Sequence, residues 1–122
     1  MKFEELLTQI GVDAQATVAR LGGMEEILRR FILKFPQDPT FSALAKAYDS
    51  RDMEALGRHV HTLKGLTANL GIEPLRQLCT EYLEGIRANL PMAELTAYQR
   101  RLTLEYRRVS GVISRYEAED PA

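Results

Sequence analysis

Hydrophobic residues recur at helical spacing along most of the chain. Steps of three and four residues place them on one face of a helix with 3.6 residues per turn. The stripes are Met24, Ile27, Leu28, Phe31, Ile32 and Phe35; Phe41, Leu44, Ala45 and Tyr48; Leu56, Val60, Leu63, Thr67 and Leu70; Leu75, Leu78, Cys79, Tyr82, Leu83 and Ile86; and Leu95, Tyr98, Leu102, Val109, Val112 and Tyr116. No segment long enough to form a strand alternates apolar and polar residues, so we predict helices and no strands.

Helix-breaking and capping residues separate these stripes. Pro36 ends one helix, and Asp38–Pro39 predicts the next, with Asp38 as N-cap and Pro39 at the first helical position. Asp49–Ser50 is a fresh start signal before a helix from about 51 to 70, and Gly71 is typical of its C-terminal cap. Asn89–Leu90–Pro91 breaks the pattern before the last helix.

Short connections make consecutive helices antiparallel neighbours. We therefore expect an all-α fold, an up-down four-helix bundle with shorter helices at about 2–9 and 13–21 packed near one end. The C-terminal helix should cover about 91–118, and the acidic tail 117–122 should fray. At 122 residues, the chain is expected to form a single domain, 1–122.

Composition narrows the functional classes. The formal net charge of -1 gives no general reason to expect nucleic acid or a membrane surface as ligand. Arg100–Arg101 and Arg107–Arg108 have acids nearby and are interpreted as a solvated face. A single cysteine, Cys79, excludes an internal disulfide and favours a reducing, cytoplasmic location. Acids interrupt the N-terminal segment where a signal peptide needs an apolar run.

The helix from about 51 to 70 carries an unusual polar face. On a helical wheel, His61 points away from the core stripe, and Gly57, Lys64, Gly65 and Ala68 surround it. Each glycine inside a helix costs about 1 kcal/mol relative to alanine. Glycines can let a neighbouring helix approach, but these lie opposite the core stripe. We therefore interpret them as clearing space for another protein to reach His61.

The same face has the chemistry for carrying a phosphoryl group. An imidazole offers an unprotonated ring nitrogen as nucleophile near neutral pH. Phosphoryl transfer needs positioning and positive charge, and Lys64, one turn after His61, can reach a phosphate there. A solvated lysine beside a surface histidine is the simpler alternative for this pair taken alone.

The stretch His61–Gly71, HTLKGLTANLG, resembles the H-x-L-K-G and A-x-L-G signature of histidine-containing phosphotransfer (HPt) domains. The similarity covers about 11–90, and it includes Gly11–Val12–Asp13, Arg20–Leu21–Gly22–Gly23, Phe31, Leu75, Leu78 and Cys79. In the final helix only the amphipathic pattern matches.

The resemblance implies a phosphorelay of two-component signal transduction. His61 would accept a phosphoryl group from a receiver-domain aspartyl phosphate and pass it to another receiver, in a response regulator or a hybrid sensor kinase. Lys64 would neutralise the phosphate, and Gly65 would keep the approach open. Many members have Gln or Glu twenty-two residues after the histidine, where it hydrogen-bonds the ring, but here that residue is Leu83. Glu84 faces differently on the helix and does not inherit the role.

Other residues have simpler interpretations. His59 and His61 form H-x-H, but residues two apart on a helix diverge by about 200° and cannot share a metal ion. Cys79 is interpreted as a core residue. Gly57, Ala68 and Arg58 are candidate partner-docking residues, although a solvated surface is the simpler role for Arg58, as it is for Arg76.

No cofactor or metal is predicted. The sequence has no Gly-rich phosphate loop and no acidic cluster after strands for magnesium. We therefore expect a stoichiometric carrier and not an enzyme. The alternative is a helical-bundle binding or adaptor module that is never phosphorylated; the presence of His61, Lys64 and Gly65 argues against it. The sequence leaves the oligomeric state open.

Overall fold

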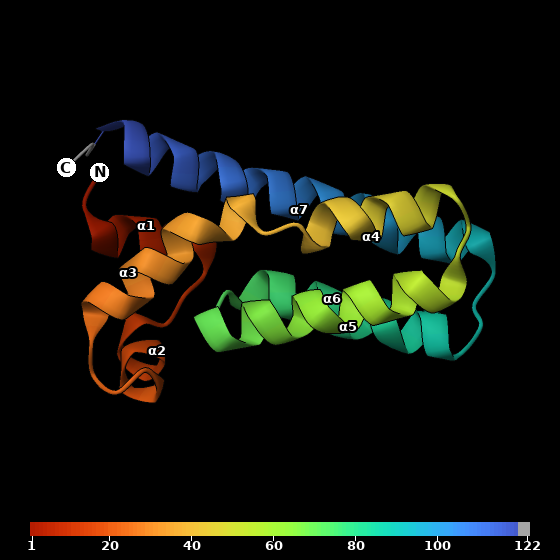
Figure 1. Ribbon diagram of the computed structural model, residues 1–122, viewed down its shortest axis with the longest axis horizontal. Helices are drawn as coiled ribbons and strands as arrows, with labels where there is room; N and C mark the ends of the chain where they lie inside the picture. Colours follow the sequence, from red (N-terminus) through yellow and green to blue (C-terminus); the bar gives the residue numbers. More distant parts are fainter. Residues whose placement is uncertain (120–122) are drawn as a thin grey trace.

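The computed structural model describes residues 1–119, and the predicted all-α fold is confirmed (Figure 1). No strand is present in that part of the chain, where a lone bridge joins Val12 to Ile72. The helices are α1 (Phe3–Ile10), α2 (Ala14–Arg20), α3 (Glu25–Lys34), α4 (Thr40–Asp49), α5 (Met53–Leu70), α6 (Glu73–Arg87) and α7 (Met92–Glu119), with a 3-10 turn, η1, at Phe35–Gln37.

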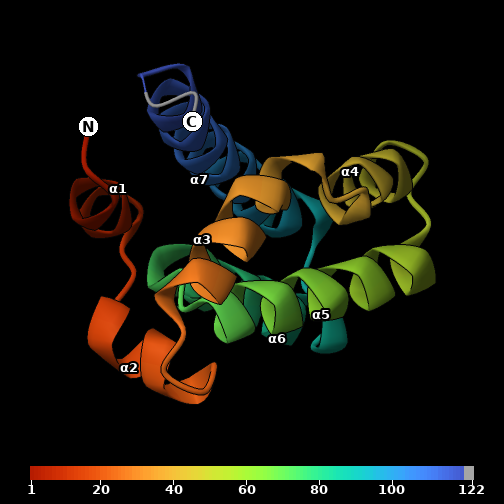
Figure 2. The ribbon, with the colours of Figure 1, turned by 60° about the vertical axis from the view of Figure 1, so that its left-hand side comes forward.

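The four helices α4 to α7 form the bundle, and α1 to α3 gather at one end of it (Figure 1). Helix α5 packs against α4 and α6, and α6 packs against α7. Tyr48 and Thr96, 2.6 Å apart between their hydroxyls, join α4 to α7, as do the rings of Phe41 and Tyr106, stacked 4.0 Å apart. Helices α5 and α7 therefore occupy diagonal corners of the bundle, as Figure 2 also shows.

The core follows the predicted stripes closely on α5 and less closely on α3. All five predicted core residues of α5 are buried. On α3, Leu28 and Ile32 are buried, as is Phe35 just after it, but Met24 is 56% and Phe31 44% exposed, so the predicted apolar face is buried only in part. Helix α3 lies at the end of the bundle (Figure 2), and neighbouring helices cover only part of its apolar surface.

The helix boundaries differ from the predicted ones at two starts. Helix α5 begins at Met53, where Asp52, and not Asp49–Ser50, accepts a hydrogen bond from the Ala55 backbone at 3.1 Å. Helix α4 begins at Thr40, one residue later than predicted, and the Asp38 carboxylate accepts from the Thr40 backbone at 2.8 Å. The capping function of Asp38 is thus as predicted, because its side chain satisfies a first-turn N–H group.

The C-terminal helix continues into the segment that was expected to fray. Helix α7 extends through Glu119, whose carboxylate lies 2.9 Å from the Met1 ammonium. Helix α1 packs along this end of α7. The contact between the two ends explains why Glu117–Glu119 stay helical; the rest of the predicted tail, 120–122, lies outside the described residues.

A tight contact fixes the N-terminal helices against the end of α5. Gly11 follows α1 with φ +82°, and a Cβ there would lie 2.5 Å from Cδ of Pro74. The next residue, Val12, pairs with Ile72 in the turn between α5 and α6. Only glycine combines this backbone conformation with such a close approach.

In the described chain, no helix is both long and apolar enough to cross a bilayer.

Candidate functional site

His61 lies on the exposed side of α5. Its neighbours Val60 and Leu63 are buried at 0% and 1% exposure, so the helix holds the imidazole outward by burying the residues on its other side. No residue among 1–119 makes a hydrogen bond or ion pair with the ring. The ring is therefore open to a visiting molecule.

A shallow hollow between α5 and α6 opens beside this ring. It is lined by Met53, Glu54, Gly57, Arg58 and His61 from α5, and by Leu83, Ile86 and Arg87 from α6. The structure thus brings three of the predicted site residues, His61, Gly57 and Arg58, into one concave surface. It adds Arg87, which we did not single out from the sequence.

The two glycines that flank His61 differ in their surroundings. A Cβ added to Gly65 would have nothing within 4 Å. A Cβ added to Gly57 would lie 3.7 Å from Cγ2 of Ile86, an ordinary van der Waals contact. Gly65 therefore lies beside open space, whereas Gly57 faces α6 and forms part of the wall of the hollow, so the two glycines do not border the same space.

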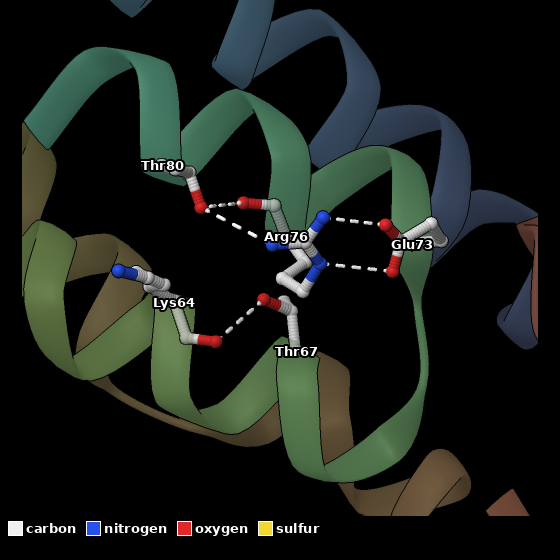
Figure 3. A network of polar contacts seen from close by, with 5 residues as sticks. All are labelled: Lys64, Thr67, Glu73, Arg76 and Thr80. Atoms are coloured by element: carbon white, nitrogen blue, oxygen red, sulfur yellow. Dashed lines mark hydrogen bonds and ion pairs between the residues drawn. The ribbon is translucent and has the colours of Figure 1, made fainter. Parts of the chain in front are cut away.

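Lys64 lies between α5 and α6, outside the hollow (Figure 3). Its side chain extends towards the N-terminal part of α5, the direction of His61, as side chains on helices do. Within residues 1–119 no carboxylate is paired with Lys64. Its ammonium is consequently available to an anion at the preceding turn of α5, where His61 lies.

Arg76, drawn beside Lys64 between the same two helices, already has a carboxylate partner (Figure 3). Its guanidinium forms two hydrogen bonds with the Glu73 carboxylate, and Thr80 donates to the Arg76 backbone at 2.9 Å (Figure 3). The hydrogen bond with Glu73 raises the pKa of Arg76. This geometry agrees with our interpretation of Arg76 as a surface residue. Of these two cations, Lys64 is the one without a carboxylate partner in the described chain.

Two arginines, one from each helix, line the hollow together with the ring. Arg58 lies one turn before His61, and one of its nitrogens is 3.6 Å from a Glu54 oxygen. Arg87 comes from the last turn of α6, is exposed, and forms no ion pair with any residue in 1–119. Sequence reasoning missed Arg87 because only the packing of α6 against α5 brings it to the site.

Leu83 gives the hollow an apolar wall. It is 2% exposed and occupies the position at which many HPt domains carry a Gln or Glu. An aliphatic side chain neither donates nor accepts hydrogen bonds, so α6 supplies no ring-orienting group at this position. The ring nitrogens of His61 are left to solvent or to a partner.

Ala68 and the exposed Phe31 border other surfaces. Ala68 lines a separate hollow with residues of α2 and the turn between α5 and α6, so it does not share the His61 hollow. A larger, mostly apolar hollow lies further along α5, lined by Leu21, Phe31, Lys34, Phe35, Asp38, Leu66, Asn69 and Leu70. In the sequence, the apolar stripe of α3 was the feature that could have indicated this hollow, because the stripe is wider than the packing of α3 against the bundle requires.

The other reactive side chains lie away from this surface. His59 is half-buried, and Cys79 is fully buried. Burial raises the pKa of the Cys79 thiol to about 12, against a smaller opposing effect of Lys64. Among residues 1–119 no group of three or more His, Cys, Asp or Glu side chains is placed to hold a metal ion.

Comparison with known proteins gives one result at the level of the family. The family model described as the Hpt domain matches residues 5–110. No curated protein and no solved structure matches the chain. The match includes α5, α6 and the hollow between them.

Proposed function

The chain belongs to the Hpt domain family, and we propose that it is a phosphocarrier whose phospho-accepting residue is His61. HPt domains mediate histidine phosphotransfer in phosphorelays, as carriers rather than catalysts, and they interact with receiver domains. The observation that carries the assignment to His61 is its outward position on α5, with an open hollow on one side and Gly65 on the other.

The phosphoryl group is transferred to His61 and then away from it in two steps. The lone pair of an unprotonated ring nitrogen of His61 attacks phosphorus of an aspartyl phosphate on a receiver. A P–N bond forms, the P–O bond to the aspartate breaks, and the aspartate leaves as a carboxylate. In the second step, an aspartate of another receiver attacks the same phosphorus, and the imidazole leaves.

Lys64 and Arg87 supply positive charge from two directions. Lys64 approaches from the following turn of α5, and Arg87 approaches from α6 across the hollow. Both are without a carboxylate partner in the described chain, so neither must break an ion pair before it binds phosphate oxygens. Arg58 shares the hollow but has Glu54 beside it, and its contribution is correspondingly smaller.

The test is a direct search for phosphohistidine. Receiver domains from the same genome are phosphorylated with acetyl phosphate and incubated with the protein, and the intact mass is measured at neutral pH and after acid treatment. We expect a gain of one phosphoryl group that acid removes, retained in His59→Gln and absent in His61→Gln. No gain with any receiver of the genome would reject the carrier and favour the adaptor module.

The same assay separates the two cations. Lys64→Ala and Arg87→Ala should each slow transfer by up to about fivefold, the effect of losing about 1 kcal/mol of interaction with an exposed charge. Lys46→Ala, which removes an exposed lysine of α4, is the matched control. Equal phosphotransfer rates for Arg87→Ala and the control would show that Arg87 takes no part in binding the phosphoryl group.

A further inference from the structure

The outward face of α7 carries a straight seam of exposed residues. Its members are Ala93, Ala97, Arg100, Leu104, Arg107, Gly111, Ser114 and Ala118, all exposed and separated by alternate steps of four and three. This is the spacing with which one helix packs along another. The seam follows α7 for most of its 28 residues, on the side away from its buried stripe.

Positive charge is concentrated along this seam. Between residues 100 and 115, α7 has five arginines and a single acid, Glu105. Arg108 is occupied by the Glu105 carboxylate and by the Gln9 carbonyl, and Arg101 lies 4.7 Å from the centre of the Tyr98 ring. The two arginines of the seam itself have no ion-pair partner among residues 1–119.

Two further features of the seam have no use within the fold. Leu104 is 63% exposed, more than any other large hydrophobic residue of the described chain. Gly111 lies inside a long helix, where glycine is among the least favourable residues. A Cβ at Gly111 would have nothing within 4 Å, so no neighbouring helix of this chain requires it.

We propose that this seam binds an acidic helical segment of a second protein. Carboxylates of that helix pair with Arg100 and Arg107, which are one heptad, about 10 Å, apart. An apolar side chain covers Leu104 between them, and the backbones approach most closely at Gly111. This inference goes beyond phosphotransfer and does not depend on it.

The charge pattern selects this occupant over others. A second copy of the chain, packed through the same seam, would bring arginines against arginines. A nucleic acid would satisfy the arginines but would leave Leu104, at the centre of the seam, without an apolar partner. A protein helix with acids on either side of an apolar residue satisfies all three positions.

The position of the seam gives the contact a consequence for signalling. Helices α5 and α7 occupy diagonal corners of the bundle (Figures 1 and 2). His61 lies on the exposed side of α5 and the seam on the exposed side of α7, so the two surfaces are separate. A protein bound to α7 leaves the hollow beside His61 open. Such a tether raises the effective concentration of the carrier near one assembly without competing for the phosphorylation site.

The test is photo-crosslinking in the source cells. A benzoylphenylalanine replaces Leu104 in the full chain, and a control chain carries it at Ser42, an exposed position of α4. After illumination, adducts are digested and sequenced by mass spectrometry. We expect an adduct specific to position 104, within a protein segment that is acidic and helix-forming.

Charge variants then test the chemistry. Arg100→Glu combined with Arg107→Glu should reduce the adduct at position 104 by about tenfold or more. Arg30→Glu with Lys46→Glu makes the same change in net charge elsewhere and should leave the yield unchanged. Phosphotransfer to His61 should be normal in both pairs, which separates a failure here from a failure of the carrier function. An adduct no stronger than that of the Ser42 control, or one with nucleic acid, lipid, a non-acidic protein or a second copy of the chain, overturns the proposal.

Discussion

Gly65 gives the sharpest test of how the site is built. Its backbone is helical and a Cβ there would have nothing within 4 Å, so alanine fits without any contact that must shift. Alanine is more favourable than glycine inside a helix by about 1 kcal/mol. We therefore expect Gly65→Ala to raise the free energy of unfolding by about 1 kcal/mol, and the melting temperature by about 3–5 °C for a chain of this size.

Gly65→Gln separates stability from access. Glutamine is also a better helix former than glycine, so the variant should be at least as stable as the natural protein. Its long side chain, however, would occupy the open space beside His61 that a receiver must enter in the proposed transfer. The rate of transfer should fall while stability rises.

The assay combines urea denaturation, followed by circular dichroism, with the phosphohistidine measurement on the same preparations. Gly57→Ala is the control for the gain in helix stability, because its Cβ would make an ordinary contact with Ile86 at 3.7 Å within the wall of the hollow. It should raise the free energy of unfolding by about as much as Gly65→Ala does. Unchanged transfer in Gly65→Gln would refute the access argument, and a loss of stability in Gly65→Ala would refute the geometry on which it rests.

Three further changes test other parts of the structure. Gly11→Ala should lower the free energy of unfolding by about 2 kcal/mol or more, measured by urea denaturation, because it combines a left-handed backbone with a collision against Pro74. Tyr82→Phe should cost about 1–3 kcal/mol in the same assay, since it leaves the buried Gln99 oxygen without its 2.7 Å donor. The Cys79 thiol has a pKa of about 12 in the fold, so the folded state retains its proton more strongly than the unfolded chain. Its stabilising contribution is complete below about pH 8.5 and is lost as pH rises towards 12. Cys79→Ala should therefore flatten the alkaline fall in stability; an identical slope in both proteins would contradict this.

The sequence was most informative where one helix has one buried side. On α5 every predicted core residue is buried, and His61 is exposed, because the helical period alone determines which side chains share a face. The general order of the helices follows from the same period and from Pro and Gly between the stripes. The four-helix arrangement then follows from the short connections between them.

What the sequence could not supply depends on contacts between helices. Arg87 reaches the hollow because α6 packs on α5 at a particular angle and register, which no pattern within α6 determines. Met24 and Phe31 are apolar and correctly spaced, but the neighbouring helices leave them 56% and 44% exposed. The sequence also could not predict that Asp52, and not Asp49, caps α5, because both residues are good N-caps. The turn at Arg51, with φ +59°, distinguishes them.

The residues around His61 reduce the stability of the fold only slightly. The two glycines near His61 together cost about 2 kcal/mol of helix propensity, a fraction of the 5–15 kcal/mol by which domains are stable. The hollow beside the ring requires no buried charge, because Leu83 forms its apolar wall, Arg58 and Arg87 are exposed, and Lys64 lies outside it. Filling a glycine therefore strengthens the bundle, whereas truncating Leu83 removes buried apolar contacts at a cost of about 2–5 kcal/mol. If His61 carries the phosphoryl group as proposed, surface substitutions on α5 and α6 should therefore alter transfer while leaving the free energy of unfolding nearly unchanged.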